Sequence, residues 1–278
     1  MTRKNFALRD LAPPGLIRRG GYLLRRLRGD GTVFAGNYAS WPDAAKAASG
    51  YADPAILEHT RRATALARDN PALFERDAVI LPRPDYPLHA LAALLHVANQ
   101  QSGRLRVLDF GGALGSTFFQ LRPFLAPLRE VRWTVIEQPH YVECGRREFA
   151  DERLRFHADV AAALSEGESD VLLLSSVLQY LPAPHAMLKE LLSHRPAFVL
   201  LDRTALHVGT TDRLTVQHNP PSIYPASYPA WFLNEQRLVA HFDAGYRLVF
   251  SFAASDYALH LGPASVYRGY FYAALPAA

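Results

Sequence analysis

The 278-residue sequence contains a single cysteine, Cys144, and this scarcity limits the chemistry open to the protein. One cysteine allows neither an intramolecular disulfide nor a metal site built from several thiolates. We expect this thiol to be buried or half-buried on a helix, in preference to being reactive beside Arg146 and Arg147. The scarcity fits a reducing compartment, so we predict a cytoplasmic protein.

Long hydrophobic runs and metal-ligand patterns are also lacking. No stretch of about eighteen apolar residues occurs, so no transmembrane helix is expected, and the N-terminal charges are not followed by the apolar segment of a secretory signal. The eleven histidines do not form H-x-x-x-H pairs with neighbouring acids. We therefore expect no metal, and His89 and His96 are expected to pack on an apolar helix.

A net excess of positive charge is confined to the first thirty residues. Residues 1–30 hold eight Arg and Lys against two Asp, a balance of +6, which leaves −2 for the rest of a chain whose net charge is +4. A body without positive excess excludes general nucleic-acid binding. Residues 16–28 mix leucine and arginine as a basic amphipathic helix at an anionic membrane does. A solvated leader over residues 1–34 is the favoured interpretation.

The sequence does not determine the oligomeric state.

Two regions follow the leader. Residues 35–102 are expected to form helices and loops, a helical cap region. Residues 103–278 alternate short apolar runs with helical segments, which is typical of βαβ units around a mostly parallel sheet. The predicted fold is α/β, a Rossmann-like, seven-stranded, doubly wound sheet with a helical N-terminal extension. Helices of the cap region are expected at Trp41–Ala48, at Pro54–Asp69, from near Pro71, and at Tyr86–Gln101.

The last two strands of the sheet are expected to pair as an antiparallel hairpin at its edge. The stretch His207–Tyr228, rich in Pro, Thr and Tyr, is expected to be a long loop. The expected strands are Arg106–Phe110, Arg132–Glu137, Arg155–His157, Val171–Ser175, Ala197–Asp202, Arg247–Phe252 and Gly269–Ala274. The expected helices between them are Ser116–Leu128, Pro139–Phe149, Val160–Leu164, His185–Leu192 and Pro229–Ala244.

A glycine-rich segment, Val107–Ser116, places a strand, the carboxylate of Asp109, three glycines and a helix in succession. The glycines let the backbone turn sharply and approach a ligand, and the helix N-terminus offers unpaired N–H groups. The G-x-G-x-x-G fingerprint of dinucleotide sites fails, since Ala113 stands two residues after Gly111. Asp109 also disfavours a pyrophosphate. It suits a cationic ligand, although it can act partly by holding the loop.

Two further acids follow later strands. Glu137 ends the second predicted strand, where a carboxylate can accept hydrogen bonds from both hydroxyls of a ribose; a solvated strand-end glutamate is the less favoured alternative. Asp159 follows the third strand, where it can contact an adenine edge or cap the helix at Val160, two roles that the sequence does not separate.

With these elements the sequence resembles the class I S-adenosyl-L-methionine (SAM)-dependent methyltransferases. The matching motifs are Val107–Gly115, Glu137, and Asp170–Pro182 at the fourth strand. One departure is Ala113, where such loops usually have glycine. More narrowly, residues 35–275 resemble a bacterial family of methyltransferases often associated with surface-polysaccharide genes. That resemblance is carried by Gly50–Asp53, Phe74–Asp77, Asp202–Thr204 and Ile223–Pro229.

The resemblance implies SAM as cofactor and a small molecule or glycan as methyl acceptor. The predicted reaction is O-methylation of a small molecule or glycan, such as a surface-polysaccharide precursor. The residues expected to bind the cofactor are Asp109, Gly111, Gly112, Gly115, Glu137, Asp159, Ser176 and Gln179.

The acceptor is expected beyond the ends of strands four and five. Tyr180, Tyr224 and Tyr228 offer walls for a sugar or aromatic ring, or pack the loop. Arg203, which we also count among the catalytic candidates, can bind a substrate carboxylate or phosphate, or pair with an acid of the protein. His207 and His218 are the candidate general bases, because imidazole titrates near neutral pH.

Two other functions remain open at this point. A non-catalytic SAM-binding or scaffold protein of glycan assembly would keep the sheet without turnover. An NAD-dependent oxidoreductase is less favoured, because the dinucleotide fingerprint fails.

Overall fold

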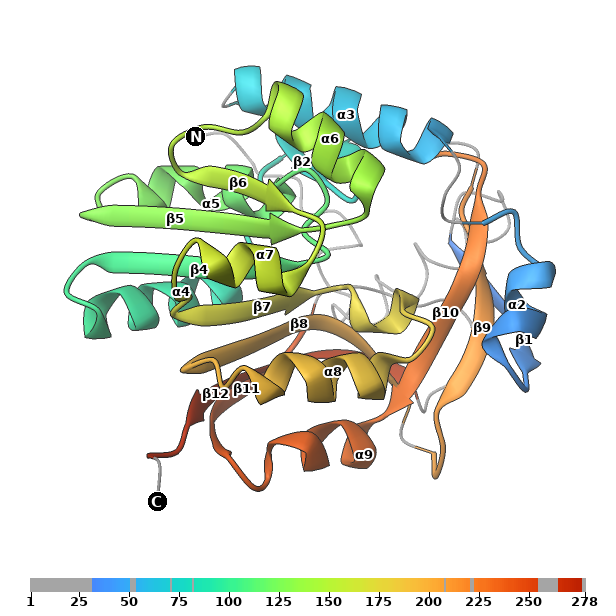
Figure 1. Ribbon diagram of the computed structural model, residues 1–278. Helices are drawn as coiled ribbons and strands as arrows, with labels where there is room; N and C mark the ends of the chain where they lie inside the picture. Colours follow the sequence, from blue (N-terminus) through green and yellow to red (C-terminus); the bar gives the residue numbers. More distant parts are fainter. Residues whose placement is uncertain are drawn as a thin grey trace, which may run out of the picture.

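The structure is a computed structural model, and it describes residues 32–50, 54–70, 72–81, 83–207, 209–220, 223–254 and 265–276. Its centre is a sheet whose strands run in the order β6-β5-β4-β7-β8-β12-β11 (Figure 1). The strands β6, β5, β4, β7 and β8 are parallel, and β12 lies antiparallel between β8 and β11. These strands are β4 Arg104–Phe110, β5 Glu130–Ile136, β6 Leu154–His157, β7 Val171–Ser175, β8 Phe198–His207, β11 Tyr246–Ala253 and β12 Ser265–Ala274.

All seven strands expected from residues 103–278 are present, and the predicted antiparallel hairpin of the last two is confirmed. The central strands are continuous apolar runs because both faces are covered by helices; in β7, for example, Val171–Leu174 are almost completely buried. This sheet order, with an antiparallel strand inserted near one edge, is the Rossmann-like topology of class I methyltransferases. The predicted fold class is therefore confirmed.

Helices cover the two faces of the sheet and bury one apolar cluster on each. The first cluster includes residues of α4 (Leu88–Gln100), α5 (Ser116–Leu125) and α6 (Pro139–Glu148). The second includes residues of α7 (Val160–Ser165), α8 (Pro184–Ser193) and α9 (Glu235–Val239). Cys144 of α6 lies in the first cluster and is buried, as expected, and desolvation raises the pKa of its thiol.

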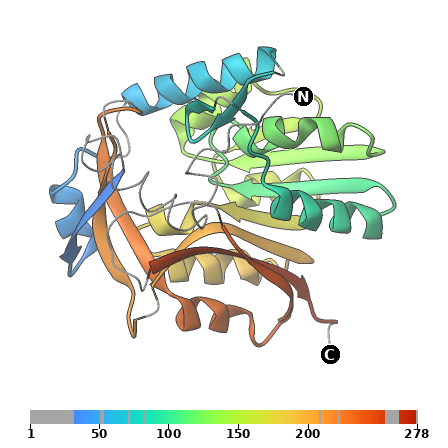
Figure 2. The same cartoon turned by 180° about the vertical axis from the view of Figure 1, so that it is seen from behind.

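A three-stranded antiparallel ribbon extends beyond the carboxyl ends of the parallel strands. It consists of β1 (Val33–Tyr38), β9 (Arg213–His218) and β10 (Ser227–Asn234), and Figures 1 and 2 show it standing beside those strand ends. It joins the main sheet where β10 pairs with the end of β8, over two residues. The ribbon therefore places its own side chains at the edge of the sheet where ligands bind in such folds.

This ribbon corrects two predictions. The expected loop His207–Tyr228 is wrong, because Arg213–His218 forms β9; its alternation of polar and apolar residues suits a strand. The expected helix Pro229–Ala244 is also wrong, because its first part is β10 and only Glu235–Val239 is α-helical. Pro229 is tolerated in β10 because at that position the strand pairs with β9 on one side only.

The cap region also differs from the expectation of helices and loops alone. Its helices α2 (Trp41–Lys46), α3 (Pro54–Asp69) and α4 are present as predicted, but β1 lies in its first part. The helix expected from near Pro71 is wrong: a hairpin of β2 (Phe74–Arg76) and β3 (Val79–Leu81) occupies this place. Its turn residues Asp77 and Ala78 have φ of 51° and 65°, which a helix does not allow.

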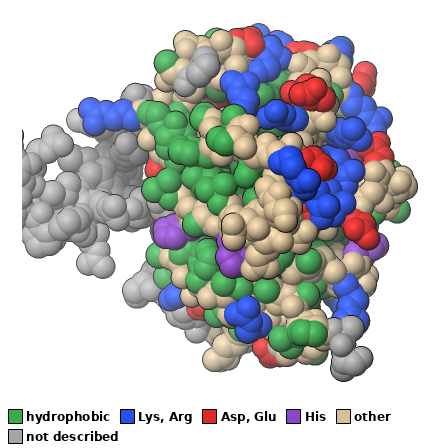
Figure 3. Space-filling view, turned by 90° about the vertical axis from the view of Figure 1, so that its left-hand side faces the viewer, with side chains coloured by type: hydrophobic (Ala, Val, Ile, Leu, Met, Phe, Trp, Pro, Cys, Tyr) green, Lys and Arg blue, Asp and Glu red, His purple; other side chains and the backbone are tan. Residues whose placement is uncertain are grey.

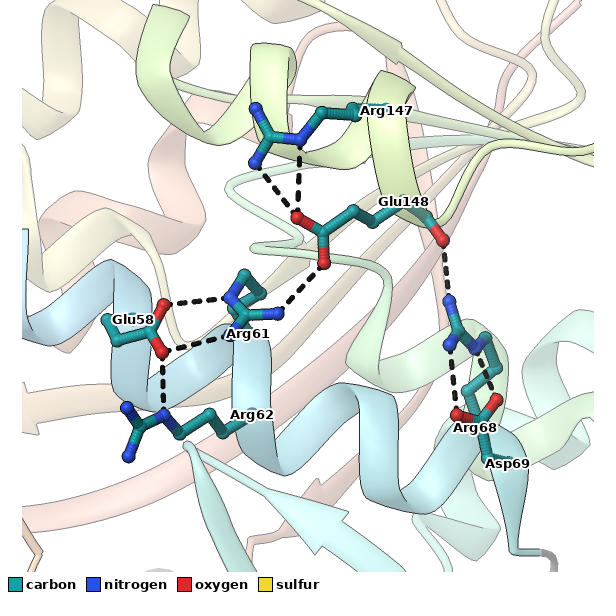
Figure 4. A network of polar contacts seen from close by, with 7 residues as sticks. All are labelled: Glu58, Arg61, Arg62, Arg68, Asp69, Arg147 and Glu148. Carbon is teal, nitrogen blue, oxygen red and sulfur yellow. Dashed lines mark hydrogen bonds and ion pairs between the residues drawn. The ribbon is translucent and has the colours of Figure 1, made fainter.

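Helix α3 is fixed to α6 by a network of charged side chains (Figure 4). Arg61 donates to Glu58 on its own helix and, at 3.0 Å, to Glu148 of α6. Arg68 donates to the backbone carbonyl of Glu148. The other side of α3 buries Ile56 and Thr60. The network thus holds α3 alongside α6 (Figure 1).

The β2–β3 hairpin is fixed to α5 by a buried carboxyl group. Glu75 is 2% exposed; its Oε1 accepts from the N–H of Ala78 at 2.7 Å, and Ser116 of α5 donates to it. The backbone carbonyl of Glu75 accepts from Gln120 at 2.7 Å. Desolvation raises the pKa of Glu75 to about 7.

The raised pKa predicts that ionised Glu75 destabilises the folded protein. The stability contributed by the protonated carboxyl group is fully present below pH 4.5, its pKa in the unfolded chain, and is lost as the pH rises through about 7. Glu75→Gln is therefore expected to raise the free energy of unfolding by up to about 3 kcal/mol at pH 8, and by much less at pH 5. Urea unfolding at both pH values measures this, with the exposed Glu152→Gln as control. An equal effect at both pH values would contradict it.

Candidate functional site

The site predicted from the sequence lies at one edge of the sheet, where β4, β5, β7 and β8 end. Asp109–Phe110 of β4 pair with Val135–Ile136 of β5, so the glycine loop and Glu137 begin side by side. Ser175 of β7 pairs with Asp202 of β8, which brings Ser176 and Arg203 together in the same way. Parallel pairing alone therefore gathers four segments that are distant in sequence.

The glycine loop makes a tight, left-handed path from β4 into α5. Gly111 and Gly115 have φ of 76° and 88°, and the N–H of Gly111 donates to the carbonyl of Ile136 at 2.9 Å. A Cβ on Gly111 would lie 2.2 Å from Cγ2 of Val177. Ala113, at the departure from the family pattern, also has a positive φ, of 51°. The loop therefore keeps the left-handed conformation there without glycine.

Asp109 lies beneath this loop and is 1% exposed. Its Oδ2 accepts from Nε1 of Trp133 at 2.8 Å, and a Cβ on Gly112 would lie 2.4 Å from the same oxygen. Desolvation raises the pKa of Asp109 to about 7, and the negative charge of Glu137 adds to this. The structure shows the loop-holding role of Asp109; a contact with the cation of the cofactor stays a prediction.

Glu137 lies half-buried beside the loop, immediately after β5. Its Oε2 accepts from the N–H of Gln138 at 2.7 Å, and the N–H of Ala113 also contributes a hydrogen bond. Desolvation raises the pKa of Glu137 to about 7. The carboxylate is thus placed where the loop, β5 and α6 meet; hydrogen bonding to a ribose stays a prediction.

Asp159 caps helix α7, one of the two roles left open by the sequence. Its Oδ1 accepts from the N–H of Ala162 at 2.7 Å. The contact with an adenine edge remains a prediction.

Gln179 joins Ser176 to Arg203 through its side-chain amide. The amide nitrogen donates to Oγ of Ser176 at 3.0 Å and to the backbone carbonyl of Arg203 at 3.2 Å. The second bond fixes the orientation of the amide, because a carbonyl only accepts. Gln179 is 1% exposed, and its Oε1 has no hydrogen-bond partner within the described structure. A buried acceptor without a donor costs free energy, so this oxygen is suited to a ligand N–H or O–H.

The three predicted acceptor-binding tyrosines do come together. Tyr180 and Tyr228 pack edge-to-face at 5.5 Å between ring centroids, and the hydroxyls of Tyr224 and Tyr228 lie 3.3 Å apart. Gln217 of β9 accepts from Tyr180 at 2.9 Å and donates to Tyr228 at 3.0 Å. We call Tyr180, Tyr224, Tyr228, Gln217 and Asn219 the tyrosine cluster; Asn219 also donates to Tyr228, at 3.0 Å.

Several residues of this region carry no sequence signal that we recognised. Gln217 and Asn219 were missed because β9 was taken for a loop, although the pattern of Arg213–His218 could have placed Gln217 on a strand face. Tyr141, in the first turn of α6, is buried. Desolvation raises the pKa of Tyr141, and the negative charge of the nearby Glu137 adds to this. His59 of α3 lies 5.8 Å from the ring of Tyr224; no sequence motif marks it.

Arg203 forms an ion pair with Asp77, in the turn of the β2–β3 hairpin. Its Nη1 and Nη2 lie 2.7 and 2.9 Å from the two carboxylate oxygens. Of the two alternatives posed by the sequence, the structure shows the ion pair, formed with Asp77 and not with the neighbouring Asp202; binding of a substrate anion stays a prediction. The hairpin turn is thereby connected to the middle of β8.

The two candidate bases lie at opposite ends of the ribbon. His218 pairs with Ser227 at the start of β10, whereas His207 pairs with Asn234 at its end. His218 is exposed and neighbours Gln217 on β9, so its side chain points to the face opposite the tyrosine cluster. The Nδ1 of His207 accepts from the N–H of Gly209 at 3.2 Å. Both histidines therefore cannot serve one site together, and either role stays a prediction.

The described residues contain no group of three or more His, Cys, Asp or Glu side chains arranged to hold a metal ion.

None of the helices in the described ranges has the length and apolar character needed to cross a bilayer. Residues 16–28, the predicted lipid-contacting segment, lie outside those ranges.

No protein-family model and no curated protein matches this chain. Among solved structures, it is similar to the N-terminal domain of EvdMO1 in the presence of S-adenosylhomocysteine (SAH) and D-fucose, with 17% identity, coverage of 78% of this chain and 96% of that chain, and a TM-score of 0.48. The CcbJ methyltransferase from Streptomyces caelestis gives 16% identity, 78% and 98% coverage, and a TM-score of 0.45. Magnesium protoporphyrin IX methyltransferase (ChlM) from Synechocystis PCC 6803 with bound SAM gives 14% identity, coverage of 67% of this chain and 78% of that chain, and a TM-score of 0.44.

The glycine loop predicts opposite outcomes for two neighbouring substitutions. Gly111→Ala places a Cβ against Val177 in a left-handed conformation, so we expect it to lower the free energy of unfolding by more than about 2 kcal/mol. Ala113→Gly relieves a positive φ and is expected to change stability by less than about 1 kcal/mol. Thermal and urea unfolding compare the two. Equal destabilisation by both would show that the loop is placed differently.

Proposed function

We propose that the protein is a SAM-dependent methyltransferase. The observation that carries the proposal is the junction of the glycine loop after β4 with Glu137 after β5, in a sheet where β12 runs antiparallel between β8 and β11. The loop lacks the dinucleotide fingerprint, and Asp109 beneath it would oppose a diphosphate. An adenosine with a cationic sulfur fits this arrangement better than NAD does.

The residues present fit such a cofactor. Glu137, when ionised, accepts hydrogen bonds from the two ribose hydroxyls. The buried Oε1 of Gln179 can accept a hydrogen bond from an N–H or O–H of the cofactor or of the methyl acceptor. Asp109, Gly111, Gly112 and Gly115 shape the loop, with Asp159 and Ser176 as further proposed contacts. SAM supplies an electrophilic methyl group on sulfur. The protein has to align an acceptor with it and to let the acceptor's proton leave.

We place the acceptor against the tyrosine cluster. Flat rings and side-chain amides that carry no charge suit a hydroxyl-bearing ring such as a sugar. Transfer to a hydroxyl forms a carbon–oxygen bond, breaks the carbon–sulfur bond, releases SAH, and sends the hydroxyl proton to a base. His207 and His218 remain the proposed bases. Because they lie at opposite ends of the ribbon, only one of them can act on a given acceptor site.

The biological setting is likewise a proposal. The narrower resemblance to a family associated with surface-polysaccharide genes supports a glycan precursor as acceptor. A cytoplasmic location follows from the single cysteine, with the basic residues 16–28 as a contact to anionic lipid.

Titration calorimetry with SAM, SAH and NAD, followed by transfer assays with labelled SAM, tests the function. Micromolar affinity for SAM and SAH, no response to NAD, and label transferred to nucleotide sugars or lipid-linked glycans are expected. Binding of NAD alone would refute the proposal. Tight SAM binding without transfer to any acceptor would favour the scaffold alternative.

Ribose recognition by Glu137 predicts that SAH affinity depends on pH. The free protein holds this carboxyl protonated below its pKa of about 7, whereas the ligand needs the ionised form. Affinity should therefore rise between pH 5.5 and 8.5. Glu137→Gln should weaken binding more than about tenfold at pH 8.5, about 1.4 kcal/mol, and flatten the profile. Calorimetry over this range decides; an unchanged profile in the variant would assign the dependence to Asp109 instead.

The tyrosine cluster predicts a separation of kinetic constants. Tyr180→Phe removes the hydroxyl that donates to Gln217, so the KM for the acceptor should rise about three- to tenfold while the KM for SAM stays unchanged. Tyr246→Phe is the matched control, because its hydroxyl donates to the carbonyl of Pro196, outside the cluster. A rise in the KM for SAM alone would indicate that the tyrosine cluster contacts the cofactor and not the acceptor.

A further inference from the structure

We propose that Arg203 binds an anionic group of the acceptor, a phosphate or a carboxylate, and that Asp77 occupies this position until the acceptor arrives. The proposal rests on the proposed function only in calling the ligand the acceptor. It narrows the acceptor class from hydroxylated rings in general to those that carry an oxyanion.

The geometry of the Asp77–Arg203 pair is that of oxyanion recognition. Two guanidinium nitrogens meet two carboxylate oxygens at 2.7 and 2.9 Å, the parallel arrangement that arginine also makes with phosphates. The two partners differ in exposure, with 15% for the side chain of Arg203 and 62% for that of Asp77. The cation is fixed in the protein, and the anion faces solvent.

The pair lies where an acceptor would approach the site. The backbone carbonyl of Arg203 accepts from Gln179, whose side chain is also bonded to Ser176. Gln179 directly precedes Tyr180 in the sequence, so its bond to Arg203 places the Arg203 backbone beside the tyrosine cluster. A ring held by that cluster would bring a phosphate or carboxylate substituent within reach of Arg203.

Asp77 is suited to being replaced. It stands in the turn of a hairpin whose strands have three residues each, and both turn residues have positive φ. An exposed carboxylate gives up little when it returns to water. Arg203, in contrast, is mostly covered and cannot lose its charge, so removing Asp77 without a replacement anion would leave its charge poorly compensated. If an anion of the acceptor replaces Asp77, Asp77 returns to water and the charge of Arg203 stays paired.

A second ion pair on the same hairpin provides the comparison. Arg76 of β2 lies 2.6 Å from Asp85, whose side chain is 58% exposed. Asp85 thus resembles Asp77 in exposure and in its arginine partner, but no contact joins it to Gln179 or Arg203 among the described residues. Asp85 itself follows the hairpin, so its replacement removes an equal charge close to the hairpin without touching the proposed oxyanion position.

The test is calorimetric titration of the full chain with three probes: glucose 1-phosphate, glucuronate and glucose. Asp77→Asn removes the competing charge and keeps a residue that tolerates positive φ. It should bind at least one anionic probe about tenfold or more tighter than the wild type does, with glucose unchanged. Which probe gains shows whether the oxyanion is a phosphate or a carboxylate. Arg203→Gln should abolish the gain in the double variant, and Asp85→Asn should match the wild type.

Two results would overturn the inference: Asp77→Asn that binds both anions no better than the wild type, or a gain that persists without Arg203. Circular dichroism and SAH titration of each variant show that it is folded. The SAH titration also separates the two proposals. If the wild-type protein does not bind SAH, the methyltransferase proposal is refuted, whereas the result for the oxyanion site still holds.

Discussion

The buried hydrogen bond from Trp133 to Asp109 fixes the segment on which the rest of the site depends. It joins β5 to the end of β4 and holds a carboxylate beneath the glycine loop. Gly112 has no Cβ, which leaves that carboxylate its room, and Gly111 lets Val177 of the neighbouring segment approach. The loop is therefore shaped mainly by packing against the protein. Its outer side, beside Glu137, is what a ligand would meet.

Around this loop, the edge of the sheet is assembled from parts remote in sequence. Helix α3, held to α6 by charged residues, and the β2–β3 hairpin, held to α5 by Glu75, cover one side; the ribbon of β1, β9 and β10 covers another. The opposite end of the sheet is different: Figure 3 shows that surface with apolar side chains gathered on one half and charged ones on the other. Exposed apolar residues of α4 include Leu88 and Leu95.

The sequence predicted well what depends on local pattern. Apolar runs identified all seven strands of the main sheet, and the succession Asp109, glycines, helix located the loop. It failed where tertiary pairing decides the structure. Arg213–His218 and Ser227–Asn234 become strands by pairing with each other, and Pro229 concealed the second. Long-range partners were also invisible: the Asp77–Arg203 pair spans 126 residues, and the hydrogen bond to Asp109 comes from a tryptophan on another strand.

The most direct measurement of the central claim is a crystal structure of the protein with SAH. We expect the ribose hydroxyls on the carboxylate of Glu137, the amino-acid part of SAH along the loop of Gly111–Gly115, and its sulfur facing the tyrosine cluster. Electron density for SAH elsewhere, or a glycine loop in contact with a diphosphate in crystals grown with NAD, would contradict it.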